Sequence, residues 1–206
     1  KALLDINRQD EFHLFGISTF ETYEHLKNIE FNKYPNANLK IIKLPAKLFR
    51  TVFIAWQKIE WPPIENFIGK VDIYHSFNWY FPPQKKGKKI ATVFDMTPIL
   101  FPKYHHKRTV QLENLRLERI KEFADLVITI SDSSKKDFLN FSPKSVVEVV
   151  YPAADNFNWE ISQERAEKVR RKYSLSPGYF LSVATFEPRK NLTGLLKAYL
   201  KSKFER

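Results

Sequence analysis

Short apolar runs alternate along the chain with longer segments whose apolar residues recur at helical spacing. Several of the short runs are apolar on both faces, which is the pattern of strands that helices cover on both sides. The strand-like runs are 12–15, 39–44, 71–74, 90–94, 126–130, 146–150 and 179–184. Their alternation with helical segments predicts an α/β fold built on a Rossmann-like, doubly wound parallel sheet that is flanked by helices.

The helical segments carry apolar residues on one side and charged residues on the other. They are 46–60, 104–123, 132–140, 162–173 and 191–204. The clearest of them, 104–123, repeats its apolar residues at intervals of three to five positions. Glu113 and Arg116 are one helical turn apart, so we expect them to pair on the exposed side of this helix.

A change in composition divides the chain. The apolar run that ends near Pro152 is followed by an irregular polar stretch and a highly charged helix, and the turn Ser176-Pro177-Gly178 then opens a new strand. We therefore expect a Rossmann-like domain over 1–152, a linker with a charged helix over 153–177, and the start of a second α/β unit over 178–206. One strand and one helix cannot bury a core, so this second unit is expected to be truncated or to need a partner.

Composition narrows the possible chemistry. The 206 residues include no cysteine and only five glycines. The lack of cysteine excludes disulfide scaffolds, thiolate metal sites and cysteine nucleophiles. The glycines are too widely spaced for a G-x-G-x-x-G or Walker A loop. No signal peptide is visible and no apolar run approaches the ~18 residues of a spanning helix, so we expect a cytoplasmic protein.

The chain is strongly basic, with 34 Lys and Arg against 23 Asp and Glu and a net charge of +11. A basic turn over 85–89, and a basic segment that opens the aromatic-rich helix 46–60, could meet an anionic membrane, which attracts each lysine by about 1 kcal/mol. The same charges could meet nucleic acid through counterion release, or could simply be solvated. We favour a core position for most of the aromatic stripe.

The segment 179–200 has the pattern of an anion site. An apolar run leads through a short loop to Asn191, a good N-cap, and to a leucine-rich helix. Ligands bind at the carboxyl ends of strands in open α/β sheets, and the N-terminus of a helix attracts anions. Thr185, Arg189 and Lys190 lie in this loop, so a phosphate or diphosphate is the expected ligand. The alternative is an ordinary capped loop with solvated basic side chains.

Polar residues also follow three other strand-like runs. His75 follows 71–74, Asp95 follows 90–94, and Ser131 opens the helix after 126–130. Histidine at a strand end suits a general base or a partner for a sugar hydroxyl, and Asp95 could also bind a hydroxyl or act as a base. A structural histidine, turn capping by Asp95 and helix capping by Ser131 remain open. The adjacent His105 and His106 lack ligand spacing, so no metal site is expected.

Several segments resemble family 4 glycosyltransferases in their order and spacing. They are Val71-Asp72-Ile73-Tyr74-His75, Thr92 to Pro98, Ala124 to Lys135, Val149-Val150-Tyr151-Pro152 and Glu187-Pro188-Arg189-Lys190-Asn191-Leu192. The last is quite specific, and the match runs through nearly the whole chain. These enzymes are retaining transferases of the GT-B type, and the chain is similar to bacterial mannosyl- and related sugar transferases of polysaccharide assembly.

The resemblance implies an acceptor domain followed by a nucleotide-sugar domain, with metal-independent transfer in the cleft between them. The residues implied are His75 and Asp95 as catalytic groups, Thr185, Arg189 and Lys190 at the donor diphosphate, and Asn78 and Ser131 on the acceptor side. The donor would be a nucleotide-diphosphate sugar and the acceptor a lipid-linked or polysaccharide glycan, with no cofactor or metal. A peripheral place at the inner membrane face would fit such an acceptor.

The chain also departs from the family pattern. Phe77 and Phe94 stand where the family often has histidine, and the family's first strand, its glycine-rich loop and its paired donor-sugar glutamates have no counterpart in 1–206. We therefore expect a fragment that lacks both ends and has no transferase turnover by itself. The alternatives are a non-catalytic basic module for nucleic acid or anionic membrane and a degenerate transferase-like subunit. On the leading interpretation no nucleic-acid partner is expected.

Overall fold

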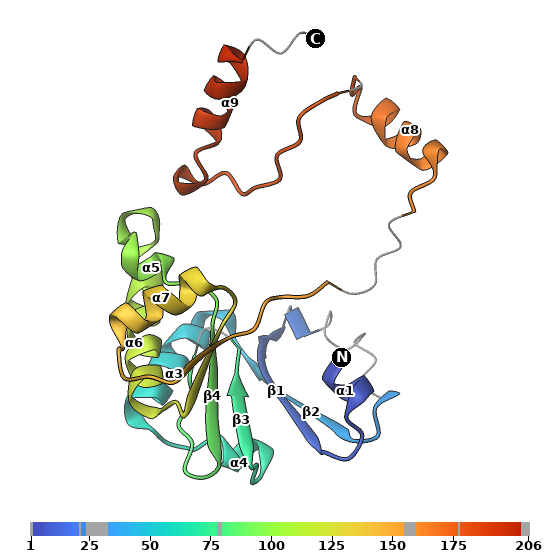
Figure 1. The fold of residues 1–206 in the computed structure, drawn as a ribbon. Coiled ribbons are helices and arrows are strands. Elements are labelled where there is room, and N and C mark those ends of the chain that lie inside the picture. The colour runs from blue at the N-terminus through green and yellow to red at the C-terminus, as the bar shows by residue number, and fades with distance from the viewer. Residues whose placement is uncertain are drawn as a thin grey trace. The chain divides into compact units, whose positions relative to one another are not determined.

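The computed structural model describes residues 2–20, 22–23, 33–77, 80–154, 160–176 and 178–202. The chain divides into two units, Lys1–Tyr151 and Pro152–Arg206. Figure 1 shows all the labelled strands in the first unit, coloured from blue to yellow, and the helices α8 and α9 in the second unit. No helix among the described residues is both long enough and apolar enough to cross a membrane.

All strand pairs in the described ranges are parallel. β1 (Phe12–Thr19) pairs with β2 (Ala37–Leu44) in a two-stranded sheet. A second sheet has the strand order β3-β4-β5-β6. Its strands are β3 (Ile73–Ser76), β4 (Lys88–Val93), β5 (Leu126–Thr129) and β6 (Val147–Val149). The predicted α/β class with Rossmann-like parallel strands and flanking helices is therefore confirmed, although the described strands form two sheets rather than one.

Helices connect β2 to β3, β4 to β5 and β5 to β6, whereas the described part of the connection from β3 to β4 contains no helix. The helices described in the first unit are α1 (Ala2–Ile6), α3 (Ala46–Ile59), α4 (Glu65–Ile68), α5 (Thr97–Leu100), α6 (Lys107–Phe123) and α7 (Asp132–Phe141). The helix that the pattern predicts from residue 104 begins at Lys107. The three residues before His105, Pro102–Tyr104, form a separate 3-10 turn, which Pro102 opens because its fixed φ suits a first helical position.

The main core lies on one face of the four-stranded sheet. Ala91 of β4 and Val127 of β5 are buried there against Leu117 of α6 and Phe138 of α7. Along β5, buried residues alternate with half-buried ones, because successive side chains point to opposite faces of the sheet. The sheet therefore has one face that is sealed by α6 and α7.

The pair Glu113 and Arg116 belongs to this sealed face, which corrects the prediction that it is exposed. Their relative exposures are only 7% and 4%, and the Arg116 Nε donates to Glu113 Oε2 at 3.0 Å. Arg116 Nη1 also donates to Thr92 O of β4 at 3.4 Å, so its side chain is directed toward the sheet rather than toward solvent. The predicted pair thus forms, but as a buried ion pair whose charges compensate each other.

A second cluster joins α3 to β1 and to the loop after β3. Phe53 and Trp56 of α3 are buried, and Phe53 stacks on Tyr80 with ring centroids 4.1 Å apart. The preferred core position of the aromatic stripe is thus confirmed for these two rings, whereas Ile59 is 67% exposed. Arg119 of α6 secures the end of α3, since its Nη1 donates to Gln57 O at 2.8 Å.

In its described ranges, 152–154, 160–176 and 178–202, the second unit contains two helices and a short 3-10 turn. They are α8 (Gln163–Lys172), the turn Pro188–Lys190 and α9 (Leu192–Lys201). The prediction of a strand over 179–184 is wrong for this structure. A strand needs hydrogen bonds from a neighbour, and no strand in the described part of this unit pairs with the segment. Its apolar side chains, such as Leu181 at 75% and Val183 at 88%, are exposed.

Candidate active site

The carboxyl ends of β3 and β4 lie side by side and bring two predicted residues to one region of the sheet. Ser76, the last residue of β3, pairs with Ala91 of β4. His75 is therefore close to the end of β3, and Asp95 follows the end of β4 by two positions. Ser131 follows the end of the neighbouring strand β5. The end of β3 with His75, and the loops that carry Asp95 and Ser131, consequently share one edge of the parallel sheet, where ligands of open α/β folds bind.

The ring of His75 is half-buried and makes one hydrogen bond. Its Nε2 lies 2.8 Å from Thr92 Oγ1 on the neighbouring strand. One face of the ring packs on Phe77, with ring centroids 3.9 Å apart. Burial lowers the pKa of His75 below its ordinary value of 6.5, because a charged imidazolium loses hydration there. The imidazole is therefore neutral at pH 7.

Asp95 is exposed and holds the turn that opens α5. Its Oδ1 accepts a hydrogen bond from Thr97 N at 2.8 Å and another from Thr97 Oγ1 at 2.6 Å. These contacts are those of turn capping, which was one of the two open interpretations. Only one carboxylate oxygen takes part, so the capping role leaves the other oxygen for a ligand.

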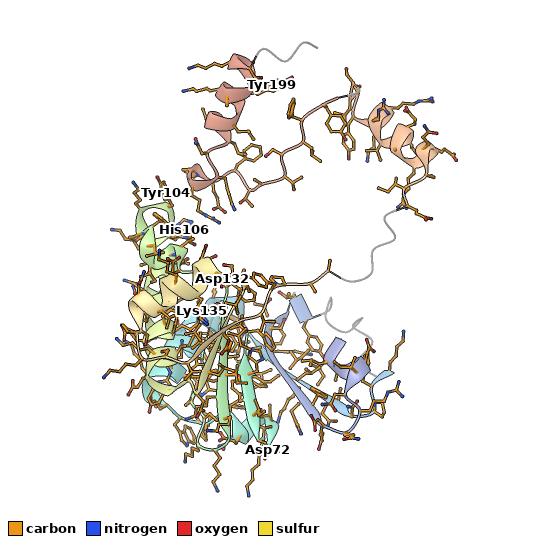
Figure 2. All side chains as sticks on the ribbon, in the orientation of Figure 1. Asp72, Tyr104, His106, Asp132, Lys135 and Tyr199 are labelled. Atoms are coloured by element: carbon orange, nitrogen blue, oxygen red, sulfur yellow. The ribbon has the colours of Figure 1, made fainter. Side chains whose placement is uncertain are left out.

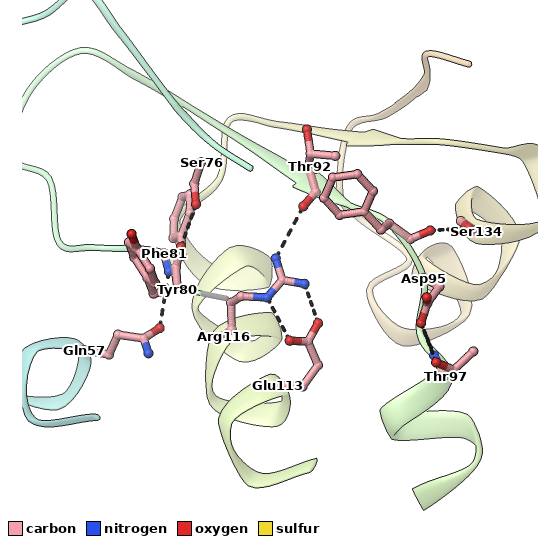
Figure 3. A network of polar contacts seen from close by, with 11 residues as sticks. Gln57, Ser76, Tyr80, Phe81, Thr92, Asp95, Thr97, Glu113, Arg116 and Ser134 are labelled. Atoms are coloured by element: carbon pink, nitrogen blue, oxygen red, sulfur yellow. Dashed lines mark hydrogen bonds and ion pairs between the residues drawn. The ribbon is translucent and has the colours of Figure 1, made fainter. Parts of the chain in front are cut away.

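Ser131 caps α7, as its second interpretation predicts. Its side-chain oxygen accepts from Ser134 N at 3.2 Å. Ser134 Oγ in turn donates to Phe94 O at 2.9 Å (Figure 3). The start of α7 is thereby tied to the residue just before Asp95. The structure thus connects the loops of Asp95 and Ser131 through Ser134, a residue that the sequence interpretation did not assign to the site.

A buried polar network joins Glu113 and Arg116 of α6 to Thr92 near the end of β4. Arg116 is held between two partners, the carboxylate of Glu113 and the main chain of β4 (Figure 3). Its Nη1 donates to Thr92 O at 3.4 Å. The same Thr92 bonds His75 through its side chain. Thr92 therefore links the predicted catalytic histidine to the core. A single hydroxyl inside an otherwise apolar run is the sequence signal that could have identified it.

Tyr151, just past the end of β6, extends the polar edge to the last strand of the sheet. Its hydroxyl donates to Asp132 Oδ2 in the first turn of α7 (Asp132 is labelled in Figure 2). That hydrogen bond raises the pKa of Tyr151 above its ordinary value. The ring is 64% exposed. Tyr151 thus offers an accessible aromatic surface on the same edge as His75.

The predicted donor-side residues lie in the second unit. Arg189 and Lys190 occupy the 3-10 turn just before α9, and both are exposed. Thr185 Oγ1 donates to Glu187 Oε1 at 2.9 Å, and Arg189 Nε donates to Glu187 Oε2 at 2.6 Å. The hydrogen bond from Thr185, reinforced by Arg189, lowers the pKa of Glu187. Glu187, which the sequence interpretation did not assign to the site, therefore orders this loop.

Asn191 caps α9 as predicted. Its side-chain oxygen accepts from Gly194 N at 3.2 Å, and its backbone adopts the left-handed conformation with φ 48°. Arg189 and Lys190 therefore stand immediately before a capped helix start, where positive charge and free N–H groups coincide. The basic pair and the helix start are thus adjacent, as the sequence predicts, and Arg189 is paired with the carboxylate of Glu187.

Of the predicted site residues, Asn78 lies outside the described residues. His75, Asp95 and Ser131 share an edge of the first unit, whereas Thr185, Arg189 and Lys190 form a local group in the second unit. Across the described ranges, no group of three or more His, Asp or Glu side chains is arranged to hold a metal ion.

No family model matches the chain. The chain is similar to the O-antigen chain mannosyltransferase B of Escherichia coli, with 32% identity over 133 residues, which are 62% of this chain and 34% of that protein. It is also similar to the serotype-specific mannosyltransferase WbdA of Escherichia coli, with 27% identity over 118 residues, which are 54% of this chain and 14% of that protein. The chain thus spans about a third of the first relative and less of the second. Both relatives are mannosyltransferases by name, and the parallel α/β fold is consistent with a Rossmann-like glycosyltransferase domain.

Proposed function

We propose that this chain is part of a glycosyltransferase that moves a sugar from a nucleotide-diphosphate sugar to a glycan. The observation that carries the proposal is the 32% identity to O-antigen chain mannosyltransferase B over 133 residues. Mannose is accordingly the proposed sugar and a polysaccharide or lipid-linked glycan the proposed acceptor. The parallel sheet with polar loops at its carboxyl edge supports the proposal, because such edges bind ligands in α/β enzymes.

The transfer exchanges one bond at the anomeric carbon for another. The bond from this carbon to the diphosphate oxygen breaks, a bond to an acceptor hydroxyl oxygen forms, and the hydroxyl proton leaves with the diphosphate or solvent. Negative charge develops on the diphosphate as it departs. Arg189 and Lys190 would stabilise that charge, with help from the N–H groups at the start of α9 and from Thr185.

On the acceptor side, His75 and Asp95 are the catalytic groups proposed to contact the bound saccharide. Asp95 is exposed at the end of β4 and has one carboxylate oxygen outside its capping bonds. Ser131 and Asn78 would contribute acceptor contacts. The resemblance to family 4 enzymes supports the finer proposal of a retaining, metal-independent reaction on a GT-B scaffold without a cofactor.

The proposed location is the cytoplasmic face of an anionic membrane. The basic turn 85–89 supports this proposal, since Lys85, Lys86 and Lys88 are all exposed. Glu65 holds the turn by accepting from Lys85 N at 2.8 Å and Lys86 N at 2.9 Å. The lysines are thus exposed on an ordered loop. Anionic lipid rather than nucleic acid is the proposed partner, because the relatives are mannosyltransferases by name and the proposed acceptor is a lipid-linked or polysaccharide glycan.

The test is a transfer assay on the protein expressed from its complete gene, with the 206-residue chain assayed in parallel. GDP- and UDP-sugars are offered with a mannose-terminated oligosaccharide, and mass spectrometry records the addition of one hexose. Transfer of one hexose is expected from the complete gene product, and the parallel assay shows whether these 206 residues are sufficient for it. Absence of transfer with every donor, together with salt-dependent DNA binding, would instead favour a basic binding module.

The variant Arg189→Ala/Lys190→Ala tests the diphosphate clamp in the same assay. We expect a loss of at least about a hundredfold in rate, the size typical for removing groups that stabilise developing charge. The matched control is Arg165→Ala/Lys168→Ala, which removes the same charges from the exposed surface of α8. Equal rates for the two variants would contradict the clamp.

A further inference from the structure

The contact between His75 and Thr92 joins two strands across the candidate active-site edge. His75 is paired with Ile90 in the register of β3 and β4, and Thr92 lies two residues farther along on the same face. Diagonal neighbours of this kind are within reach of longer side chains. The 2.8 Å separation of Nε2 and Oγ1 is that of a well-formed hydrogen bond.

The surroundings of Thr92 decide which atom donates. Thr92 is only 6% exposed, and its hydroxyl has no other hydrogen-bond partner among the described residues. If Nε2–H donated to Oγ1, the hydroxyl hydrogen would be enclosed without an acceptor, which is unfavourable for a buried donor. If the hydroxyl donates to the Nε2 lone pair, both groups are satisfied. The second arrangement places the ring proton on Nδ1.

The other ring nitrogen remains open to a ligand. In the part of the chain that the structure describes, Nδ1 makes no hydrogen bond and is not among the enclosed polar atoms that lack a partner. Phe77 restricts one face of the ring. The ring is therefore fixed at Nε2 and along one face, and Nδ1–H is the group that can meet a bound molecule.

We propose that Thr92 is a positioning residue that holds His75 in the Nδ1–H tautomer, so that Nδ1–H donates a hydrogen bond to an oxygen atom of a bound saccharide. The assignment of the ligand rests on the proposed function, whereas the tautomer does not. Arg116 contributes indirectly, since its bond to Thr92 O holds the main chain from which the hydroxyl projects. Burial keeps the ring neutral, so the ring carries a single N–H hydrogen, which lies either on Nδ1 or on Nε2.

The proposal changes the chemistry that is expected of His75. A neutral imidazole with hydrogen on Nδ1 and its Nε2 lone pair occupied has no free acceptor, so it cannot remove a proton from an acceptor hydroxyl. It can orient a sugar hydroxyl or stabilise negative charge that develops on an oxygen. The general-base role that the sequence suggests for His75 is therefore replaced by a donor role.

The tautomer is tested on the 206-residue chain by nitrogen NMR of labelled histidine side chains. The signals of His75 are identified as those missing from His75→Gln. In the wild-type chain we expect a protonated-type shift for Nδ1 and an unprotonated-type shift for Nε2. The opposite assignment, with the proton on Nε2, would overturn the proposal without any variant at Thr92.

Two substitutions at Thr92 then test its role. Thr92→Val keeps the shape and strand preference but removes the hydroxyl, so the two nitrogen shifts should move toward each other as the tautomers exchange. Thr92→Ser keeps the hydroxyl and should retain the wild-type pattern. Circular dichroism and the thermal midpoint establish that both variants fold. Wild-type shifts in Thr92→Val would overturn the proposal.

Transfer rates of the complete gene product provide the second measurement. Thr92→Val should lower kcat about tenfold, and Thr92→Ser should stay within about threefold of wild type. Equal rates for Thr92→Val and wild type would count against the positioning role. If the wild-type protein transfers no sugar, the proposed function fails, and the nitrogen shifts still decide the tautomer.

Discussion

At the residue scale, polar side chains that look alike in the sequence have different roles in the structure. Asp95 and Ser131 were predicted as possible site residues or caps, and both form capping bonds. His75, in contrast, is held across two strands by Thr92. Local spacing could predict the caps because caps act within a few residues. It could not predict a contact between residues 17 positions apart, which depends on strand register.

The lowered pKa of His75 predicts a pH dependence of stability. Because the pKa lies below 6.5 in the folded chain, the unfolded chain binds more protons in this range. The contribution of neutral His75 to the free energy of unfolding is therefore present above about pH 6.5. It is lost as the pH falls from there through the folded-state pKa. Urea unfolding between about pH 7.5 and 5.5 should show this decline in wild type and a flatter profile in His75→Gln.

The control for this measurement is His106→Gln, since His106 is exposed at the start of α6 (Figure 2). Its profile should follow that of wild type. Identical slopes for His75→Gln and wild type would show that the half-buried ring does not contribute to the pH dependence.

At the element scale, helices were predicted better than strands. The amphipathic pattern predicted α3, α6, α7, α8 and α9 closely, because one exposed face fixes the period of a helix. The run 179–184 has the composition of a strand, yet it has no partner strand in the described part of its unit. Composition indicates only that the residues of a segment favour the β conformation. A strand forms only where another strand supplies hydrogen bonds.

The turn before β4 provides an element-scale prediction. Gly87 has φ +76°, and a Cβ at this position would lie 2.5 Å from Val71 O. Gly87→Ala should therefore destabilise the fold by about 2–4 kcal/mol, from the left-handed backbone and the clash together. Gly69→Ala is the matched control, because Gly69 has φ +80° but nothing within 4 Å of the added atom. In urea unfolding, the free energy of unfolding of that variant should fall by only about 1 kcal/mol. Equal losses in the two variants would show that the contact with Val71 O does not contribute.

At the scale of the whole molecule, the excess of positive charge was predictable and its distribution was only partly so. The net charge of +11 follows from the sequence. Which arginines are buried does not, because Arg116 and Arg119 sit on the inner side of α6 and bond to Glu113 and Gln57. These two charges belong to the core, so fewer positive side chains are exposed to bind anions than the composition suggests.

Vesicle binding tests the proposed membrane surface. Lys85→Glu/Lys86→Glu should reduce cosedimentation with phosphatidylglycerol vesicles by at least about tenfold, since each reversed lysine removes about 1 kcal/mol or more of attraction. Lys136→Glu/Lys144→Glu is the matched control, because both lysines are exposed outside the basic turn. Equal binding by the two variants, or binding that neutral vesicles match, would contradict the proposal.

The position of Gly87 at one end of β4 has a geometric consequence for the proposed acceptor. Lys85 and Lys86 of the basic turn precede the first residue of β4, and Asp95 lies two positions past its last, so the six-residue strand separates them by about 20 Å. An acceptor anchored in a membrane at the turn would have to extend its sugar end along the whole strand. The arrangement therefore favours long glycans over a single sugar attached to its lipid.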